Sequence, residues 1–212
     1  GGGWWAVHDI VDGRILVIIG DVTGHGVPAA MITAAAKAAC DVGRALEGPR
    51  LTAARILELM NRAIYESARR RFVMTCFACV IDTRARSITY ANAGHNFPYL
   101  YRHPSTLRDG ESEITVLMSR GNRLGDVPDS TFAESSQALR SGDRLVFYTD
   151  GLIECESPTG EEYGEKRLRS AIRAAGDQGP AQMRDSLMTT AAQFYGNCPR
   201  KDDITLVVAQ LV

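Results

Sequence analysis

Two pairs of helical segments, each flanked by β-rich segments, constrain the fold of this 212-residue chain more than any other feature. Pro28 begins the first helical segment, which is rich in alanine and runs to about Arg44. Thr52 is a suitable N-cap for the second, in which apolar residues recur every four positions. The other pair is predicted at Glu161–Ala175 and Pro180–Tyr195. Because each pair needs a sheet face to cover, the order predicts an α+β fold with two stacked antiparallel sheets and helices outside both.

The predicted strands are short and mostly joined by turns. Trp4–Ile10 and Ile15–Ile19 flank Asp12-Gly13, a dipeptide typical of hairpins. The later predicted strands are Phe72–Ile81, Ser87–Asn92, Pro98–Tyr101, Ile114–Met118, Phe132–Leu139, Arg144–Tyr148 and Ile204–Val212. The polar segment His103–Glu113 is predicted to be a loop. Since the chain contains no repeat and no long linker, we expect residues 1–212 to form one domain.

Composition narrows the range of functions. Hydrophobic residues make up 45% of the chain and charged residues 23%, as in ordinary soluble domains. The net charge is -1 and the basic residues are scattered, which argues against nucleic-acid binding. No apolar run is long enough to span a bilayer and no secretory signal is evident, so we expect no membrane contact. Five cysteines, an odd number, favour a reducing cytoplasm. A chain that begins at Gly1 is expected to be part of a longer protein.

Cys76 and Cys79 invite a metal-site interpretation, but both fall within the predicted strand Phe72–Ile81. Residues three apart in a strand point to opposite faces, so these two thiols cannot hold one metal ion together.

Acidic residues at the ends of strong predicted strands are better candidates for metal binding. Asp21 follows one predicted strand, Asp150 follows another, and Asp202 and Asp203 precede the last. Carboxylates that converge at strand ends repel one another unless a cation neutralises them, and hard oxygen ligands suit Mg²⁺ or Mn²⁺. Nearby glycines would let the backbone approach such an ion: Gly20, Gly24, Gly26 and Gly151. Taken alone, each aspartate is more simply interpreted as a turn former, and it is their joint occurrence at strand ends that favours a metal site.

A series of short motifs then gives a resemblance to a known family. In chain order they are Gly20-Asp21-Val22-Thr23-Gly24-His25-Gly26-Val27-Pro28-Ala29-Ala30, Asn92-Ala93-Gly94-His95, Leu124-Gly125, Ser141-Gly142-Asp143, Thr149-Asp150-Gly151-Leu152-Ile153-Glu154, Tyr163-Gly164 and Asp202-Asp203-Ile204-Thr205-Leu206. The series resembles the PPM (type two C) phosphatases, specifically the bacterial branch that contains the stage II sporulation protein E phosphatase and the activators of the general stress sigma factor.

The resemblance implies an α-β-β-α sandwich with a site for two Mn²⁺ or Mg²⁺ ions. By position, Asp21 would bridge both ions and the backbone carbonyl of Val22 would help to bind one. Asp150 and Asp202 would complete the ligands of the first ion, with Asp203 the less favoured of the acidic pair. Two such cations would supply a water of lowered pKa that attacks phosphorus in line.

The chain departs from this family at Gly3. Members usually have Gly-Gly-Asp before an aromatic pair, and that Asp supports the second metal ion, whereas here Gly3 precedes Trp4-Trp5. The departure predicts weaker metal affinity or slower turnover. The resemblance gives His25 and His95 a loop-shaping role rather than that of a base, while His8 is predicted in a strand and His103 in an exposed loop. An arginine fork would suit phosphate, with four candidates: Arg69, Arg70, Arg71 and Arg123.

The activity implied is hydrolysis of phosphoserine or phosphothreonine on a protein, by resemblance a small anti-sigma-factor antagonist. A pseudophosphatase that binds its partner without turnover is the alternative, because Gly3 replaces an expected ligand. A binding domain without metal chemistry would require every aspartate to be a turn former. The resemblance also suggests an upstream sensor domain and a possible homodimer. The helices between Pro28 and Arg70 follow the Asp21 loop, so their movement would gate metal binding.

Overall fold

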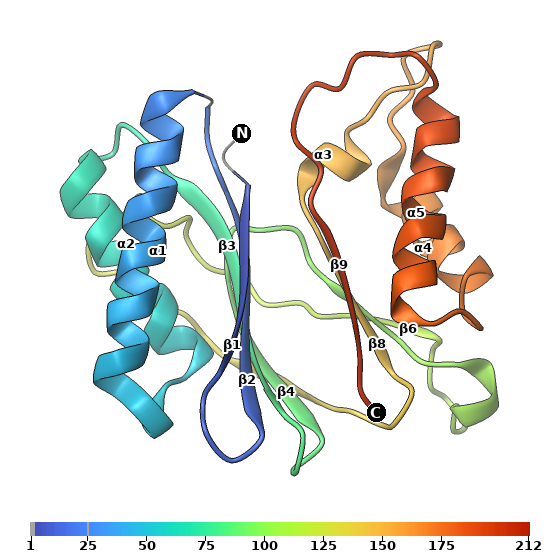
Figure 1. Ribbon diagram of the computed structural model, residues 1–212, viewed down its shortest axis with the longest axis horizontal. Helices are drawn as coiled ribbons and strands as arrows, with labels where there is room; N and C mark the ends of the chain where they lie inside the picture. The colour runs from blue at the N-terminus through green and yellow to red at the C-terminus, as the bar shows by residue number, and fades with distance from the viewer. Residues whose placement is uncertain (1–2, 25) are drawn as a thin grey trace. The chain divides into compact units, whose positions relative to one another are not determined.

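The structure is a computed structural model that describes residues 3–24 and 26–212 (Figure 1). The chain forms two compact units. Unit 1 comprises Gly1–Phe97 and Met118–Leu139, and unit 2 comprises Pro98–Leu117 and Arg140–Val212. Each unit has its own sheet and its own hydrophobic core. The expectation of a single domain over residues 1–212 stays a prediction.

Unit 1 contains a five-stranded antiparallel sheet in the order β1-β2-β3-β4-β7. Its strands are β1 (Trp4–Asp9), β2 (Arg14–Val22), β3 (Met74–Asp82), β4 (Ser87–Ala93) and β7 (Ser135–Ala138). Its helices are α1 (Val27–Glu47), the 3-10 helix η1 (Gly48–Arg50) and α2 (Ala53–Ala68). Helices α1 and α2 cover one face of this sheet, and their buried side chains form one core with the facing side chains of β2, β3 and β4 (Figure 1).

Unit 2 contains a four-stranded antiparallel sheet in the order β6-β5-β8-β9. Its strands are β5 (Tyr99–Tyr101), β6 (Ile114–Val116), β8 (Arg144–Tyr148) and β9 (Leu206–Gln210). Its helices are the 3-10 helix η2 (Pro104–Thr106), α3 (Asp150–Ile153), α4 (Gly164–Ala174) and α5 (Pro180–Tyr195). The second core lies between α4, α5 and one face of this sheet, with three buried tyrosines of β5 and β8 at its centre.

The predicted α+β class, with two antiparallel sheets that each carry a helix pair, is confirmed. Pro28 lies in the first turn of α1, and the Thr52 hydroxyl accepts a hydrogen bond from the backbone N–H of Arg55 (3.1 Å), so both helix starts were predicted correctly. Cys76 packs into the helix-covered core of unit 1 and Cys79 does not, as alternation along a strand requires. Within residues 3–24 and 26–212, every helix is too short or too polar to cross a bilayer.

Most boundaries differ from the sequence prediction by one to three residues, and three of the differences concern the candidate site. Strand β2 continues through Asp21 to Val22, so Asp21 lies inside the strand and does not follow it. Strand β9 begins at Leu206, two residues after the predicted start. Asp150 begins a four-residue helix, α3, which is too short to produce a periodic pattern in the sequence. All three differences lie next to predicted metal ligands.

Candidate functional site

Asp21 is held by the pairing of β2 with β3 in unit 1. It lies opposite Thr75, whose hydroxyl donates a hydrogen bond to the Asp21 carbonyl oxygen (3.4 Å). The preceding residue has to be glycine, because a Cβ at Gly20 would lie 2.7 Å from the Thr75 carbonyl oxygen and 2.6 Å from the Met74 side chain. The close approach at Gly20 therefore keeps β2 in the sheet as far as Asp21. The sequence prediction had ended this strand at Ile19, before Gly20.

The segment that follows is fastened to the start of β3. The Thr23 backbone N–H and hydroxyl both donate to the Val73 carbonyl oxygen, at 3.0 and 3.1 Å. Gly24 and Gly26 have φ angles of 94° and 82°, values that favour glycine, and Gly26 is the N-cap of α1. His25 lies outside the described residues. The carbonyl of Val22 stays a predicted ligand.

The Asn92-Ala93-Gly94-His95 motif forms a tight turn at the end of β4. The Asn92 side-chain amide accepts a hydrogen bond from the His95 N–H (2.7 Å) and donates one to the His95 carbonyl oxygen (2.9 Å). The His95 ring is 6% exposed, and its Nδ1 lies 3.2 Å from the Thr75 hydroxyl, opposite Asp21 on β3. This geometry fits the loop-shaping role expected for His95.

Leu124-Gly125 is a second loop anchored on β3. Leu124 and Met74 exchange two backbone hydrogen bonds, at 2.8 and 3.0 Å. The Gly125 N–H donates to the side-chain oxygen of Asn61, a residue of α2 that is 1% exposed (2.8 Å). Asn61 therefore joins α2 to this loop. Sequence analysis missed it because its partner lies 64 positions away and leaves no local pattern.

In unit 2, two threonines bring the acidic motifs together. The Thr149 hydroxyl accepts a hydrogen bond from the Thr205 N–H (2.9 Å), and the Thr149 N–H donates to the Thr205 carbonyl oxygen (3.1 Å). A carboxylate oxygen of Asp150 consequently lies within 4.8 Å of one of Asp202. A Cβ at Gly151 would lie 2.3 Å from the Asp203 carbonyl oxygen, so only glycine allows this approach. The segment Thr149–Gly151 and the segment Asp202–Thr205 therefore keep each other in position through backbone contacts.

The environment of Asp150 and Asp202 fits a cation. Asp150 Oδ1 is buried and accepts no hydrogen bond from the residues that the structure describes, although a buried carboxylate oxygen needs a partner. One oxygen of Asp202 accepts the Asp203 N–H (2.7 Å). The pKa of Glu154 is raised, first by burial and then by the negative charge of Asp150. Clustered carboxylates with an unsatisfied buried oxygen are the donor set that Mg²⁺ or Mn²⁺ prefers.

Two further motifs have structural roles in unit 2. Asp143 is 2% exposed, and its two oxygens accept a fork of hydrogen bonds from Arg102 (2.9 and 2.7 Å). The backbone N–H of Arg140 adds a third (2.7 Å). Tyr163 is buried against Phe194, with ring centroids 5.4 Å apart, directly before Gly164 begins α4. These contacts fasten the segment before β8 to Arg102, which follows β5, and the start of α4 to α5.

Of the arginines considered for phosphate, Arg123 is engaged by Asp126, 3.2 Å away. Arg69 and Arg71 instead line an open pocket of about 300 Å³ together with Pro28, Met31, Ile32, Ser67, Ala68 and Phe72. The guanidinium groups of Arg69 and Arg71 form no ion pair with a carboxylate of the described chain. Arg69 and Arg71 stay candidates for an anionic ligand, as does Arg70, whose guanidinium lies 5.9 Å from the centroid of the Tyr65 ring.

The two remaining histidines of the described residues are His8 and His103. His8 lies in β1, as predicted. His103 lies in a loop, but it is partly buried and its Nε2 lies 2.7 Å from the Asp177 carboxylate, so the prediction of an exposed residue was only partly right.

Comparison with known proteins decides the family. The family model described as Stage II sporulation protein E matches residues 11–212. The chain belongs to this family. The membership inferred from the motifs is thereby confirmed, and the family consists of metal-dependent phosphatases of the PP2C type.

Individual relatives of the stage II sporulation protein E family agree. The chain is 29% identical over 146 residues to phosphoserine phosphatase RsbU of Bacillus subtilis, which is 69% of this chain and 41% of that protein. It is 30% identical over 133 residues to protein IcfG of Synechocystis, 63% of this chain and 20% of that protein. The chain thus spans less than half of the length of either relative. The SiaA-PP2C domain of Pseudomonas aeruginosa superposes with a TM-score of 0.84 at 26% identity, over 99% of this chain and 80% of that one.

Proposed function

We propose that the chain hydrolyses phosphoserine or phosphothreonine on a protein substrate, with Mn²⁺ or Mg²⁺ held by Asp21, Asp150 and Asp202. The observation that carries the proposal is the pair of carboxylates from Asp150 and Asp202, within 4.8 Å of each other, with one buried oxygen that has no hydrogen-bond partner among the described residues. The phosphoserine phosphatase RsbU among the relatives supports the substrate class. A phosphorylated anti-sigma-factor antagonist as substrate, an upstream sensor domain and a cytoplasmic location belong to the same proposal.

The roles of the side chains follow from how each is held. Mn²⁺ or Mg²⁺ held by these aspartates would supply a water of lowered pKa and would neutralise charge on the phosphoryl group. Asp150 contributes an oxygen that is already desolvated, and the hydrogen bonds of Thr149 and Thr205 keep it beside Asp202. Asp21, fixed by the pairing of β2 with β3, would supply a further carboxylate ligand. Rigid strand ends and a short helix are suitable supports for ligands that must keep their geometry.

The test compares Asp150→Asn with the control variant Asp185→Asn. Asp185 is an exposed residue of α5 in the same unit, and its carboxylate pairs with the neighbouring Arg184. Hydrolysis of a phosphoserine peptide with Mn²⁺ is measured together with Mn²⁺ binding by calorimetry. Asp150→Asn should abolish both, while Asp185→Asn should leave both unchanged. Activity that persists in EDTA, or Mn²⁺ binding that is unchanged in Asp150→Asn, would contradict the proposal.

A pseudophosphatase is the second candidate function, and Gly3 favours it. Trp4 pairs with Gly20 in the register of β1 and β2, so Gly3 is level with Asp21. A carboxylate at position 3 would therefore lie beside Asp21, where cross-strand neighbours are about 5 Å apart. Gly3→Asp should raise Mn²⁺ affinity and turnover if the chain as written lacks this ligand. Full turnover in the chain as written, with no gain from Gly3→Asp, would rule the pseudophosphatase out.

A further inference from the structure

A pocket of unit 1 lies between the start of α1, the end of α2 and residues 69–72, and it is here named the α1–α2 pocket. Its volume is about 300 Å³, and no acidic residue occurs among the described residues that line it. Arg69 and Arg71 line it with exposed side chains, and neither forms an ion pair with a carboxylate of the described chain. Ile32 and Phe72 supply an apolar wall. The pocket therefore suits an anionic group carried by a partly apolar ligand.

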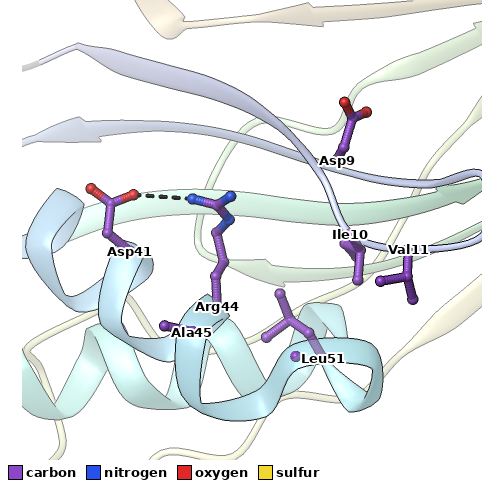
Figure 2. Close-up of a pocket in the computed structure, with 8 residues that line it drawn as sticks. Asp9, Ile10, Val11, Asp41, Arg44, Ala45 and Leu51 are labelled. Atoms are coloured by element: carbon purple, nitrogen blue, oxygen red, sulfur yellow. Dashed lines mark hydrogen bonds and ion pairs between the residues drawn. The ribbon is translucent and has the colours of Figure 1, made fainter.

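A second pocket of unit 1 shows what distinguishes these two arginines. That pocket, of about 260 Å³, lies beside the β1–β2 turn and is lined by Arg44, but also by Asp9 and Asp41 (Figure 2). Arg44 lies 3.3 Å from the Asp41 carboxylate, so its charge is already balanced within the chain. In the α1–α2 pocket no carboxylate of the described residues has this position, and an incoming anion would meet both guanidinium groups.

The backbone that carries these arginines has an unfavourable conformation. Arg69 has a φ of 45° and a ψ of 52°, and the next residue, Arg70, has a φ of 69°. Glycine adopts this left-handed region readily, whereas a residue with a Cβ is strained there. The two left-handed residues turn the chain from the end of α2 towards β3. Strained backbone of this kind tends to occur at ligand-binding and catalytic sites.

The α1–α2 pocket lies a short way along the chain from the proposed metal ligand Asp21. Asp21 pairs with Thr75 across β2 and β3, and Phe72, a wall of the pocket, precedes Thr75 by three residues. Three residues of extended chain span at most about 11 Å. Gly24, three residues after Asp21, also lies beside Phe72, because a Cβ on Gly24 would be 4.0 Å from the Phe72 ring. A peptide with its phosphoserine at Asp21 would therefore reach the pocket about three residues away.

We propose that the α1–α2 pocket binds an acidic side chain of the protein substrate, about three residues from the phosphoserine, through Arg69 and Arg71. The proposal rests on the proposed phosphatase function. Asp21 does not line the pocket, so the carboxylate bound there is separate from the phosphoryl group that is hydrolysed. Arginine binds carboxylates through forked, charge-assisted hydrogen bonds. Arg69 and Arg71 thus determine which substrates bind and take no part in hydrolysis.

Steady-state hydrolysis of three phosphoserine peptides with Mn²⁺ tests the specificity. The first peptide carries Glu three residues from the phosphoserine on both sides, the second carries Gln there, and the third carries both Glu residues at least eight positions away. The first should have a KM about tenfold lower than the other two. The double variant Arg69→Gln/Arg71→Gln should lose this preference with kcat unchanged, and the control Arg44→Gln should keep it. Equal KM values for the unmodified chain, or a preference that survives in the double variant, overturn the proposal.

An NMR titration in EDTA separates this proposal from the proposed function, because it needs neither metal nor turnover. The peptides are the first two of the series with serine in place of phosphoserine. The amide signals of residues 69–72 should shift saturably with the Glu peptide, and should not shift with the Gln peptide or in the double variant. Unchanged signals at residues 69–72 overturn the pocket even if the chain is an active phosphatase. A chain that hydrolyses no peptide contradicts the proposed function, and the titration then still decides on the pocket.

Discussion

Gly151→Ala tests whether close backbone packing is what positions Asp150. The added Cβ would lie 2.3 Å from the Asp203 carbonyl oxygen. Real Cβ atoms essentially never come closer than 3.0 Å to such an atom. The backbone of Asp150–Gly151 or of Asp202–Asp203 must therefore move by at least about 0.7 Å. Overpacking of this kind costs about 1–3 kcal/mol of unfolding free energy. A ligand displacement approaching 1 Å can lower turnover by about 10²-fold.

The assay has three readouts: urea denaturation, Mn²⁺ binding by calorimetry and steady-state hydrolysis of a phosphoserine peptide. Gly179→Ala is the matched control, because it is also a glycine of unit 2 but nothing lies within 4 Å of its added Cβ. We expect Gly151→Ala to lose Mn²⁺ affinity and kcat together, and Gly179→Ala to lose neither. Unchanged Mn²⁺ affinity and kcat in Gly151→Ala would refute the positioning argument, even if the variant were less stable.

Three further predictions concern buried or strongly paired groups of unit 2. Asp143→Asn should lower the free energy of unfolding in urea by about 1.5–3 kcal/mol, because its charged hydrogen bonds with Arg102 are lost and Glu111, 3.6 Å away, remains to pair with Arg102. A loss below about 0.5 kcal/mol would contradict this. Tyr163→Phe should be neutral or stabilising in the same assay, since the buried hydroxyl has no hydrogen-bond partner among the described residues, and clear destabilisation would show that the hydroxyl has one. Hydrogen bonding to Arg140 lowers the pKa of Glu111 to about 2, so its stabilising effect should be complete above about pH 4.5 and lost as the pH falls through about 2. Glu111→Gln should flatten the pH dependence of unfolding in that window, and an unchanged profile would argue against the pairing.

The parts of the fold that the sequence predicted well are those with strong local signals. Arg144–Tyr148 and Pro180–Tyr195 were predicted with the observed bounds, the first as a compact apolar run and the second because proline follows glycine at the helix start. Thr52 was predicted as a cap from its residue type and position, and its hydroxyl does cap α2. In each case the residues that determine the element lie within it or next to it.

The predictions that failed depended on residues distant in the chain. The extension of β2 to Val22 results from the contact of Gly20 with β3, more than fifty positions away. The delayed start of β9 results from the hydrogen bonds between Thr205 and Thr149, which are 56 positions apart. The acidic candidates were found because their motifs are local. What holds Asp150 beside Asp202 is not local, and no periodicity or spacing in the sequence could reveal it.

Neither unit is a continuous stretch of chain, and this affects how the protein can be made and cut. Strand β7, from the insertion Met118–Leu139, completes the sheet of unit 1 only after the β5–β6 hairpin of unit 2 has been synthesised. Unit 2 in turn lacks β9 until Leu206–Gln210 has been synthesised. A single cut after Phe97 would therefore release neither unit intact. During translation, the first unit should acquire full protection from proteolysis only once Leu139 has emerged.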